Sequence, residues 1–117
     1  MNDLTRFDGT SPFDQIRLRR MDGSEFWSAR ELMPILAYEK WQKFSGVIER
    51  AKASARNQGA PIEDNFTASG KVSGARGPAQ EDYELSRFAC YLVAMNGDPR
   101  KPEVAAAQAY FAIRTRE

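Results

Sequence analysis

Hydrophobic side chains are densest near the end of the chain, where their pattern predicts two consecutive helices. Residues 86–95 start with Ser86, a favourable capping residue, and then carry almost no polar side chain, as is typical of a buried helix. Gly97 is expected to end this helix in the left-handed conformation, and Asp98-Pro99 prevents its continuation. Pro102 suits the first position of a second helix. The apolar stripe expected on that helix comprises Val104, Ala107, Tyr110 and Phe111.

A β-hairpin is predicted near the start of the chain. Apolar and basic side chains alternate from Phe13 to Arg20, and Asp22-Gly23 is the dipeptide typical of a tight hairpin turn. Residues 25–27 provide the return strand. This alternation is expected to place Arg17 and Arg19 on the solvent side of the strand, opposite Ile16 and Leu18.

Two further helices are predicted after the hairpin. Ser28 and Glu31 have the spacing of a capping box for a short helix over residues 28–37, and Pro34 is expected to kink or shorten this helix. A longer helix follows Tyr38. Its buried face is expected to comprise Trp41, Phe44, Ile48, Ala51 and Ala55, which recur at steps of three and four.

A second hairpin is predicted from residues 67–73 and 80–85, after a single helical turn at 62–66. The order of elements therefore predicts an α+β fold in which two short β-hairpins pack with four or five helices. We expect a single domain over residues 13–117, preceded by a flexible lead-in over residues 1–12.

Composition mainly excludes functions. A net charge of +1 over 117 residues does not indicate a strongly basic nucleic-acid binder, so any such role requires a local basic patch. The chain has no histidine, and its one cysteine, Cys90, lies in the most apolar segment. We therefore expect no internal disulfide, no metal, no cofactor and no enzymatic activity. No apolar stretch approaches the roughly 20 residues of a membrane span and no signal-peptide pattern is present, so a cytoplasmic protein is expected.

Several segments together resemble a known family. They are Phe26–Pro34, Trp41, Asp82-Tyr83, Leu85–Leu92, Asn96–Pro102, Ala105–Gln108 and Tyr110-Phe111. On these segments the chain resembles, from about Phe13 to its end, the N-terminal domain of the DNA-damage-inducible protein D family. It is more distantly similar to the BRO-N domain of viral and phage antirepressors. The run Asn-Gly-Asp-Pro-Arg-Lys-Pro is the most specific part of the resemblance.

The resemblance implies a BRO-N-like fold and a role in the bacterial DNA-damage response or in prophage induction. Domains of the wider group are associated with binding DNA and with binding repressor proteins. Two departures from the family pattern stand out. Ala37 occupies a position where related domains usually have glycine, which makes a left-handed turn there less easy. The longer C-terminal part of the family is absent, together with any function that requires it, and we expect more protein beyond residue 117.

Basic residues on the two hairpins are the candidates for DNA contact. They are Arg17, Arg19, Arg20, Lys71, Arg76 and Arg87. Arginine forks on the first hairpin suit phosphates, although charges at a strand edge also deter aggregation. The other three residues surround a glycine-rich loop that could cradle a phosphate or become ordered on nucleic acid, and that could equally be a flexible hairpin tip.

The alternative function is an antirepressor-type interaction module that binds a repressor or the recombinase filament. Tyr110, Phe111 and Ile113 cannot all face one core, so they are the expected partner-binding residues. Either function is compatible with a homodimer. The remaining charged groups are expected to be solvated or structural: Lys40, Lys43, Arg50, Glu81, Asp82, Glu84 and Arg100-Lys101.

Overall fold

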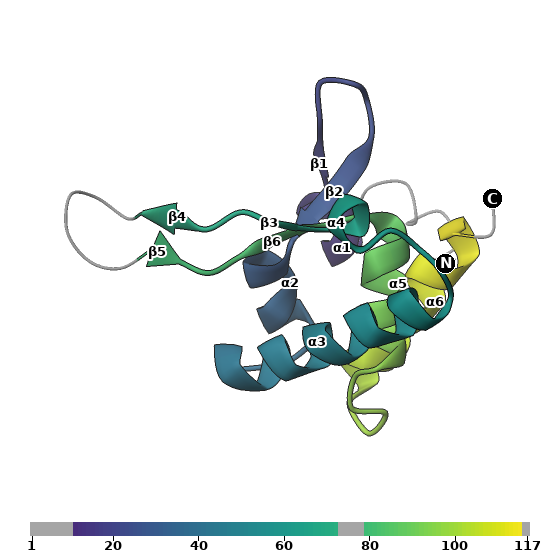
Figure 1. Cartoon of the computed structure of the whole chain (residues 1–117). Helices are drawn as coiled ribbons and strands as arrows, with labels where there is room; N and C mark the ends of the chain where they lie inside the picture. The colour runs from purple at the N-terminus through teal and green to yellow at the C-terminus, as the bar shows by residue number, and fades with distance from the viewer. Residues whose placement is uncertain (1–10, 73–78, 116–117) are drawn as a thin grey trace.

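Six helices and a four-stranded antiparallel sheet form the part of the chain that the computed structural model describes, residues 11–72 and 79–115 (Figure 1). The side chains of residues 71, 72, 79 and 113–115 lie outside this description, and so do residues 1–10 of the predicted lead-in. The predicted α+β class is confirmed. Two of the helices, α1 (Pro12–Gln15) and α4 (Ile62–Asn65), are single turns of four residues, which leaves four longer helices.

Both predicted hairpins exist, and they share one sheet. The strands are β1 (Leu18–Arg19), β2 (Glu25–Ser28), β3 (Phe66–Ala68) and β6 (Tyr83–Leu85), in the spatial order β1-β2-β6-β3. The hairpins join where β2 pairs with β6, with Trp27 opposite Leu85. The strands β4 (Lys71–Val72) and β5 (Ala79–Gln80) form a separate two-stranded ribbon that continues the second hairpin away from the body (Figure 1).

The strand predicted from Phe13 onwards was wrong in its first half. The Ser11 hydroxyl accepts a hydrogen bond from the Phe13 N–H (3.1 Å), and Pro12 occupies the first helical position, so these residues begin a helical turn. The strand that follows has only two residues. The expected alternation also fails, because Leu18 is 44% exposed beside the exposed Arg19.

Two of the four longer helices begin at the serine caps that the sequence predicts. The four longer helices are α2 (Ala29–Ile35), α3 (Trp41–Asn57), α5 (Arg87–Met95) and α6 (Pro102–Thr115). The Ser28 hydroxyl accepts from the Glu31 N–H (3.3 Å) at the start of α2, and the Ser86 hydroxyl accepts from the Ala89 N–H (3.0 Å) at the start of α5. Both predicted caps are confirmed.

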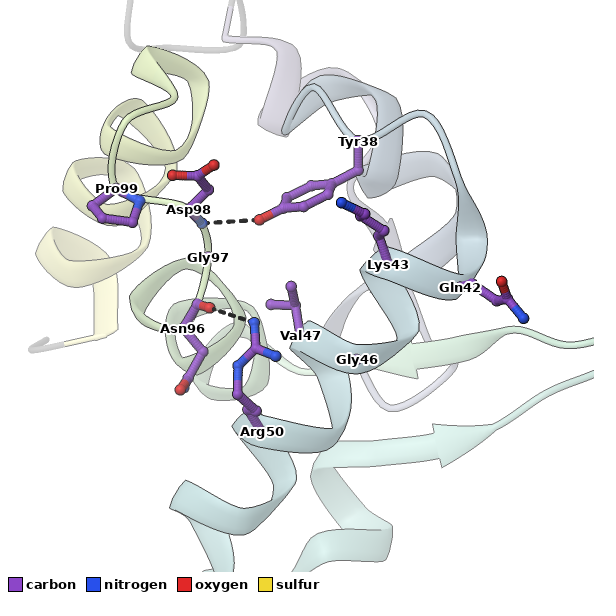
Figure 2. Close-up of a pocket in the computed structure, with 10 residues that line it drawn as sticks. All are labelled: Tyr38, Gln42, Lys43, Gly46, Val47, Arg50, Asn96, Gly97, Asp98 and Pro99. Carbon is purple, nitrogen blue, oxygen red and sulfur yellow. Dashed lines mark hydrogen bonds between the residues drawn. The ribbon is translucent and has the colours of Figure 1, made fainter.

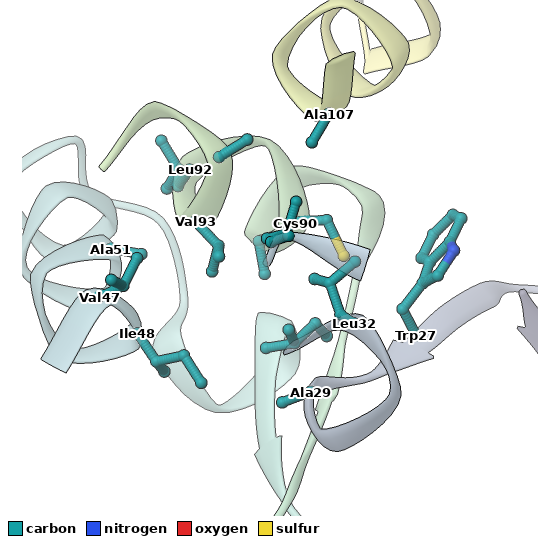
Figure 3. Packing of buried hydrophobic residues seen from close by; sticks show 14 of the residues in the cluster. Trp27, Ala29, Leu32, Val47, Ile48, Ala51, Cys90, Leu92, Val93 and Ala107 are labelled. Carbon is teal, nitrogen blue, oxygen red and sulfur yellow. The ribbon is translucent and has the colours of Figure 1, made fainter. Parts of the chain in front are cut away.

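Helix α5 lies at the centre of the core, as its apolar sequence predicts. Figure 3 shows Cys90 and Val93 of α5 between the apolar face of α3, the side chains of Trp27 and Leu32, and Ala107 of α6. Each of these α5 side chains is fully buried. Burial raises the pKa of the Cys90 thiol well above 9.0, so this cysteine is an inert core residue.

Two turn residues behave differently from expectation. Gly97 does not have the positive φ predicted for it, whereas Ala37 adopts the left-handed conformation with φ 65°. Glycine suits position 97 for a steric reason, because a Cβ atom there would lie 3.1 Å from Cγ1 of the buried Val104. The backbone at position 37 makes the left-handed turn despite carrying a side chain.

Candidate nucleic-acid interface

The β1–β2 hairpin ends in a turn that is held by its own hydrogen bonds. The Arg20 N–H donates to Ser24 O (2.8 Å), and the Gly23 N–H donates to Arg20 O (2.9 Å). The Asp22 carboxylate accepts from both the N–H and the hydroxyl of Ser24 (2.9 and 2.7 Å), and these bonds lower its pKa. Gly23 has φ 91°, which favours glycine. These interactions hold the turn without the side chain of Met21, which is fully exposed.

Three predicted arginines lie on this hairpin, in three environments. Arg17 is within 3.3 Å of Asp14 and 3.5 Å of Glu25, and Arg20 is within 3.1 Å of Glu84. The exposed Arg19 donates to a carbonyl, Gly23 O (3.1 Å), and has no carboxylate partner among the described residues. Of the three, Arg19 is therefore the most available for a phosphate.

Arg87 is partly buried against the sheet. Its Nε and Nη2 atoms donate to the two carboxylate oxygens of Glu25 (3.1 and 2.7 Å), and its side chain is 12% exposed. The guanidinium lies 4.9 Å from the centre of the Trp27 ring. The hydrogen bond from Arg87 lowers the pKa of Glu25 below its ordinary value of 4.5. This geometry is that of a structural ion pair, so Arg87 lies apart from the exposed hairpin cations.

The second hairpin is extended into an arm by its β4–β5 ribbon. Ser69 N–H donates to Asp82 O (3.0 Å), which connects the sheet to the pair Lys71–Gln80. The Asp82 carboxylate also accepts from the Ser28 hydroxyl (2.8 Å) and the Arg30 N–H (3.0 Å), so it fastens the base of the arm to the start of α2. The structure places the backbone of Lys71 on this arm, while the Lys71 side chain and the whole of Arg76 lie outside the described residues.

A stacked pair at the base of the arm was not predicted as a site. The Arg30 guanidinium lies 4.0 Å from the centre of the Trp41 ring, and both residues bond to Glu81: Arg30 Nε donates to its carbonyl (2.6 Å) and Trp41 Nε1 to its carboxylate (2.9 Å). Trp41 was expected in the core, yet it is only partly buried. The sequence alone could not indicate this pair, because its three residues come from α2, α3 and the arm and meet only in the folded structure.

The predicted partner-binding residues do not form one exposed patch. Phe111 is fully buried against Phe13 and Trp27, with ring centres 5.4 and 5.1 Å apart. Tyr110 is partly buried and donates its hydroxyl to Asp14; burial, with this bond, raises its pKa above 10.0. The Ile113 side chain lies outside the described residues.

The acidic residues near the arm have individual structural partners. Glu81 bonds to Trp41, Asp82 caps α2 and Glu84 pairs with Arg20. Within residues 11–72 and 79–115, no group of three or more potential metal-ligating side chains was found. Nor is any helix in these ranges long and apolar enough to cross a membrane.

Comparisons with known proteins agree with this fold. Residues 15–112 match the family model of the BRO family, N-terminal domain. The chain is 45% identical to DNA damage-inducible protein D of Escherichia coli (strain K12) over 108 residues, which are 90% of this chain and 39% of that protein. No solved structure matched the chain significantly. On the sequence match and the α+β architecture, this chain belongs to the BRO family and carries its N-terminal domain.

Proposed function

We propose that this domain is a non-enzymatic regulatory module that contacts DNA through its hairpins, in the DNA-damage response or in prophage induction. The name of its relative, DNA damage-inducible protein D, supports the cellular context. The observation that carries the proposal is the β4–β5 arm, a two-stranded ribbon that projects from the body (Figure 1). The major groove of DNA, about 12 Å wide, admits a two-stranded ribbon.

The β1–β2 hairpin provides a second projection in a different direction (Figure 1). Its exposed Arg19 has a guanidinium suited to a phosphate oxygen. Phosphate contacts fix a protein on the duplex without reading its sequence, so this arrangement favours DNA binding with little sequence preference. Lys71, whose backbone lies on the arm, and Arg76, which is outside the described residues, remain predicted DNA-contacting cations.

The test is fluorescence anisotropy with labelled duplex and single-stranded DNA across a salt series. Binding is expected to weaken steeply with salt, and the double variant Lys71→Ala/Arg76→Ala is expected to reduce the slope of log K against log salt by about two. The control variant Lys40→Ala/Arg56→Ala removes the same charge from α3 and should leave the slope unchanged. The proposal would be contradicted by an absence of DNA binding at low salt, or by an affinity that does not change with salt concentration.

A protein partner is the second candidate function, and exposed apolar groups at the first hairpin favour it. Met21 on the turn is fully exposed, and Leu18 on the neighbouring strand β1 is 44% exposed. The partner would be a repressor or the recombinase filament. Co-sedimentation with the filament is expected to be lost in Leu18→Ser/Met21→Ser and kept in Met95→Ser, a control that changes a 50% exposed methionine on α5. Equal binding by both variants would argue against this surface.

A further inference from the structure

An open groove of about 540 Å³ lies between α3 and the turn that joins α5 to α6. Lys43, Gly46 and Arg50 line it from α3, while Gly97 and Asp98 line it from the turn. Tyr38 also lines the groove, and Figure 2 shows its hydroxyl directed toward Asp98 of the turn. The groove is formed by residues separate from the two hairpins.

Two cations of the groove have no carboxylate partner in the described part of the chain. Lys43 is exposed and makes no hydrogen bond or ion pair there, so all three donors of its ammonium group are unused. Arg50 uses one nitrogen, Nη2, to donate to the carbonyl of Asn96 (3.3 Å). Its remaining donors are available, and they lie two helical turns from Lys43 on one face of α3.

The Tyr38 hydroxyl adds a third donor. Its oxygen accepts a hydrogen bond from the Asp98 N–H (2.9 Å), so the hydroxyl hydrogen is left to donate. The residue is 9% exposed, and its hydroxyl donates no hydrogen bond within the described residues. The hydroxyl can therefore donate to an acceptor that enters the groove.

The one carboxylate in the groove is neutralised locally. Arg100 donates to Asp98 through Nε (3.0 Å), Nη2 (3.1 Å) and its backbone N–H (3.0 Å). These bonds lower the pKa of Asp98 from 3.8 to about 2, so its charge is retained and paired. Lys101, which donates to Ala37 O (3.0 Å), adds a further positive charge beside Tyr38. The groove is therefore positively charged and rich in donors.

We propose that this groove binds a phosphoryl group, with Lys43 and Arg50 as its cations and the Tyr38 hydroxyl as a neutral donor. Phosphate oxygens only accept hydrogen bonds, which matches the excess of donors, and a guanidinium can offer them two parallel bonds. A free phosphorylated ligand and the backbone of a nucleic acid share this chemistry. The proposal goes beyond DNA contact by the hairpins, because none of its residues lies on either hairpin.

The experiment follows the backbone amide NMR signals of Gly46 and Gly97 while inorganic phosphate replaces chloride at constant ionic strength. Saturable shifts of both signals are expected. Lys43→Ala and Arg50→Ala should each weaken binding roughly tenfold, because each loses a charge-assisted hydrogen bond. Lys40→Ala is the matched control, an exposed lysine three residues away that does not line the groove, and its binding should be unchanged. Tyr38→Phe should also weaken binding, by less than either cation variant.

Shifts that do not saturate, or that persist in the Lys43→Ala/Arg50→Ala variant, would overturn the proposal. Titration of a 5′-mononucleotide and of an oligonucleotide without terminal phosphates then distinguishes the two sources, since only the second offers phosphodiesters alone. The double variant Lys71→Ala/Arg76→Ala should retain phosphate binding. If that variant loses DNA affinity and still binds phosphate, or keeps DNA affinity and no longer binds phosphate, the two proposals can be judged independently.

Discussion

Arg87 and Arg50 are both arginines on helices, yet they lie in opposite environments. Arg87 faces Glu25, holds both of its carboxylate oxygens and stacks on Trp27. Arg50 faces a backbone carbonyl across an open groove and is exposed. The difference arises from the opposing element, since β2 presents a carboxylate to α5, whereas the α5–α6 turn presents the Asn96 carbonyl to Arg50 and keeps its Asp98 carboxylate paired with Arg100. A basic residue is therefore available for a ligand only where no carboxylate faces it.

The same contrast distinguishes the hairpin arginines. Arg17 and Arg20 have carboxylate partners, while Arg19, between them in sequence, has none in the described part of the chain. Exposed ion pairs contribute little to stability, whereas removing one member of a buried pair costs much more. The first variants below compare the partly buried Arg87–Glu25 pair with the open groove.

The largest effect is expected when Arg87 is replaced by methionine. Arg87→Met leaves Glu25 with only the longer contact to Arg17 (3.5 Å) and should lower the free energy of unfolding by about 2 kcal/mol. The matched change Lys43→Met removes the same charge from an exposed site and should cost less than about 0.5 kcal/mol. Urea denaturation monitored by circular dichroism measures both. Equal losses would show that burial does not distinguish the two regions.

The two glycines that line the groove should respond in opposite directions to alanine. Gly97→Ala brings a Cβ to 3.1 Å from Val104 and should cost about 2 kcal/mol through overpacking. At Gly46 the nearest atom, Arg50 Nη1, would be 3.8 Å away, so Gly46→Ala should stabilise α3 by up to about 1 kcal/mol. Thermal unfolding of the two variants provides the comparison, and a stabilising Gly97→Ala would refute the steric explanation.

Glycine at position 37 should stabilise the protein. Ala37 has φ 65°, a conformation that costs a non-glycine residue roughly 1–2 kcal/mol, so Ala37→Gly should gain about 1 kcal/mol after the added chain entropy. The control Ala53→Gly, at an exposed position inside α3, should instead lose about 1 kcal/mol. Chemical denaturation of both proteins measures the two changes, and a loss at position 37 would mean that its backbone is not strained.

The smallest expected effect is on the loss of folding stability at low pH. The pKa of Glu25 is lowered in the folded protein, so its contribution to stability is complete above pH 4.5 and is lost as the pH falls further. For Asp98 the corresponding loss occurs between pH 3.8 and about 2. The variant Glu25→Gln should therefore show a flatter decline of stability just below pH 4.5, and Asp98→Asn a flatter decline only at lower pH. Denaturation midpoints measured from pH 6 to pH 2 test this order.

Local signals predicted much of this fold because local physics determines it. Ser28 and Ser86 cap their helices as their spacing predicts, since a cap needs only residues within one turn. The Asp22-Gly23 turn forms for the same reason. The strand expected at Phe13 failed because a serine cap and Pro12 outweighed an alternation of only a few residues.

Other features depended on partners distant in sequence. The chain by itself determined where the four longer helices begin, most of their apolar faces and that Cys90 is buried, because periodicity and capping act within a few residues. Only the tertiary structure decided which charges are paired. Glu25 lies 62 residues from Arg87, and Asp82 caps a helix 52 residues away at Arg30. Electrostatic partners are set by distance in space, so the open groove at Lys43 and Arg50 became visible only once the α5–α6 turn was placed against α3.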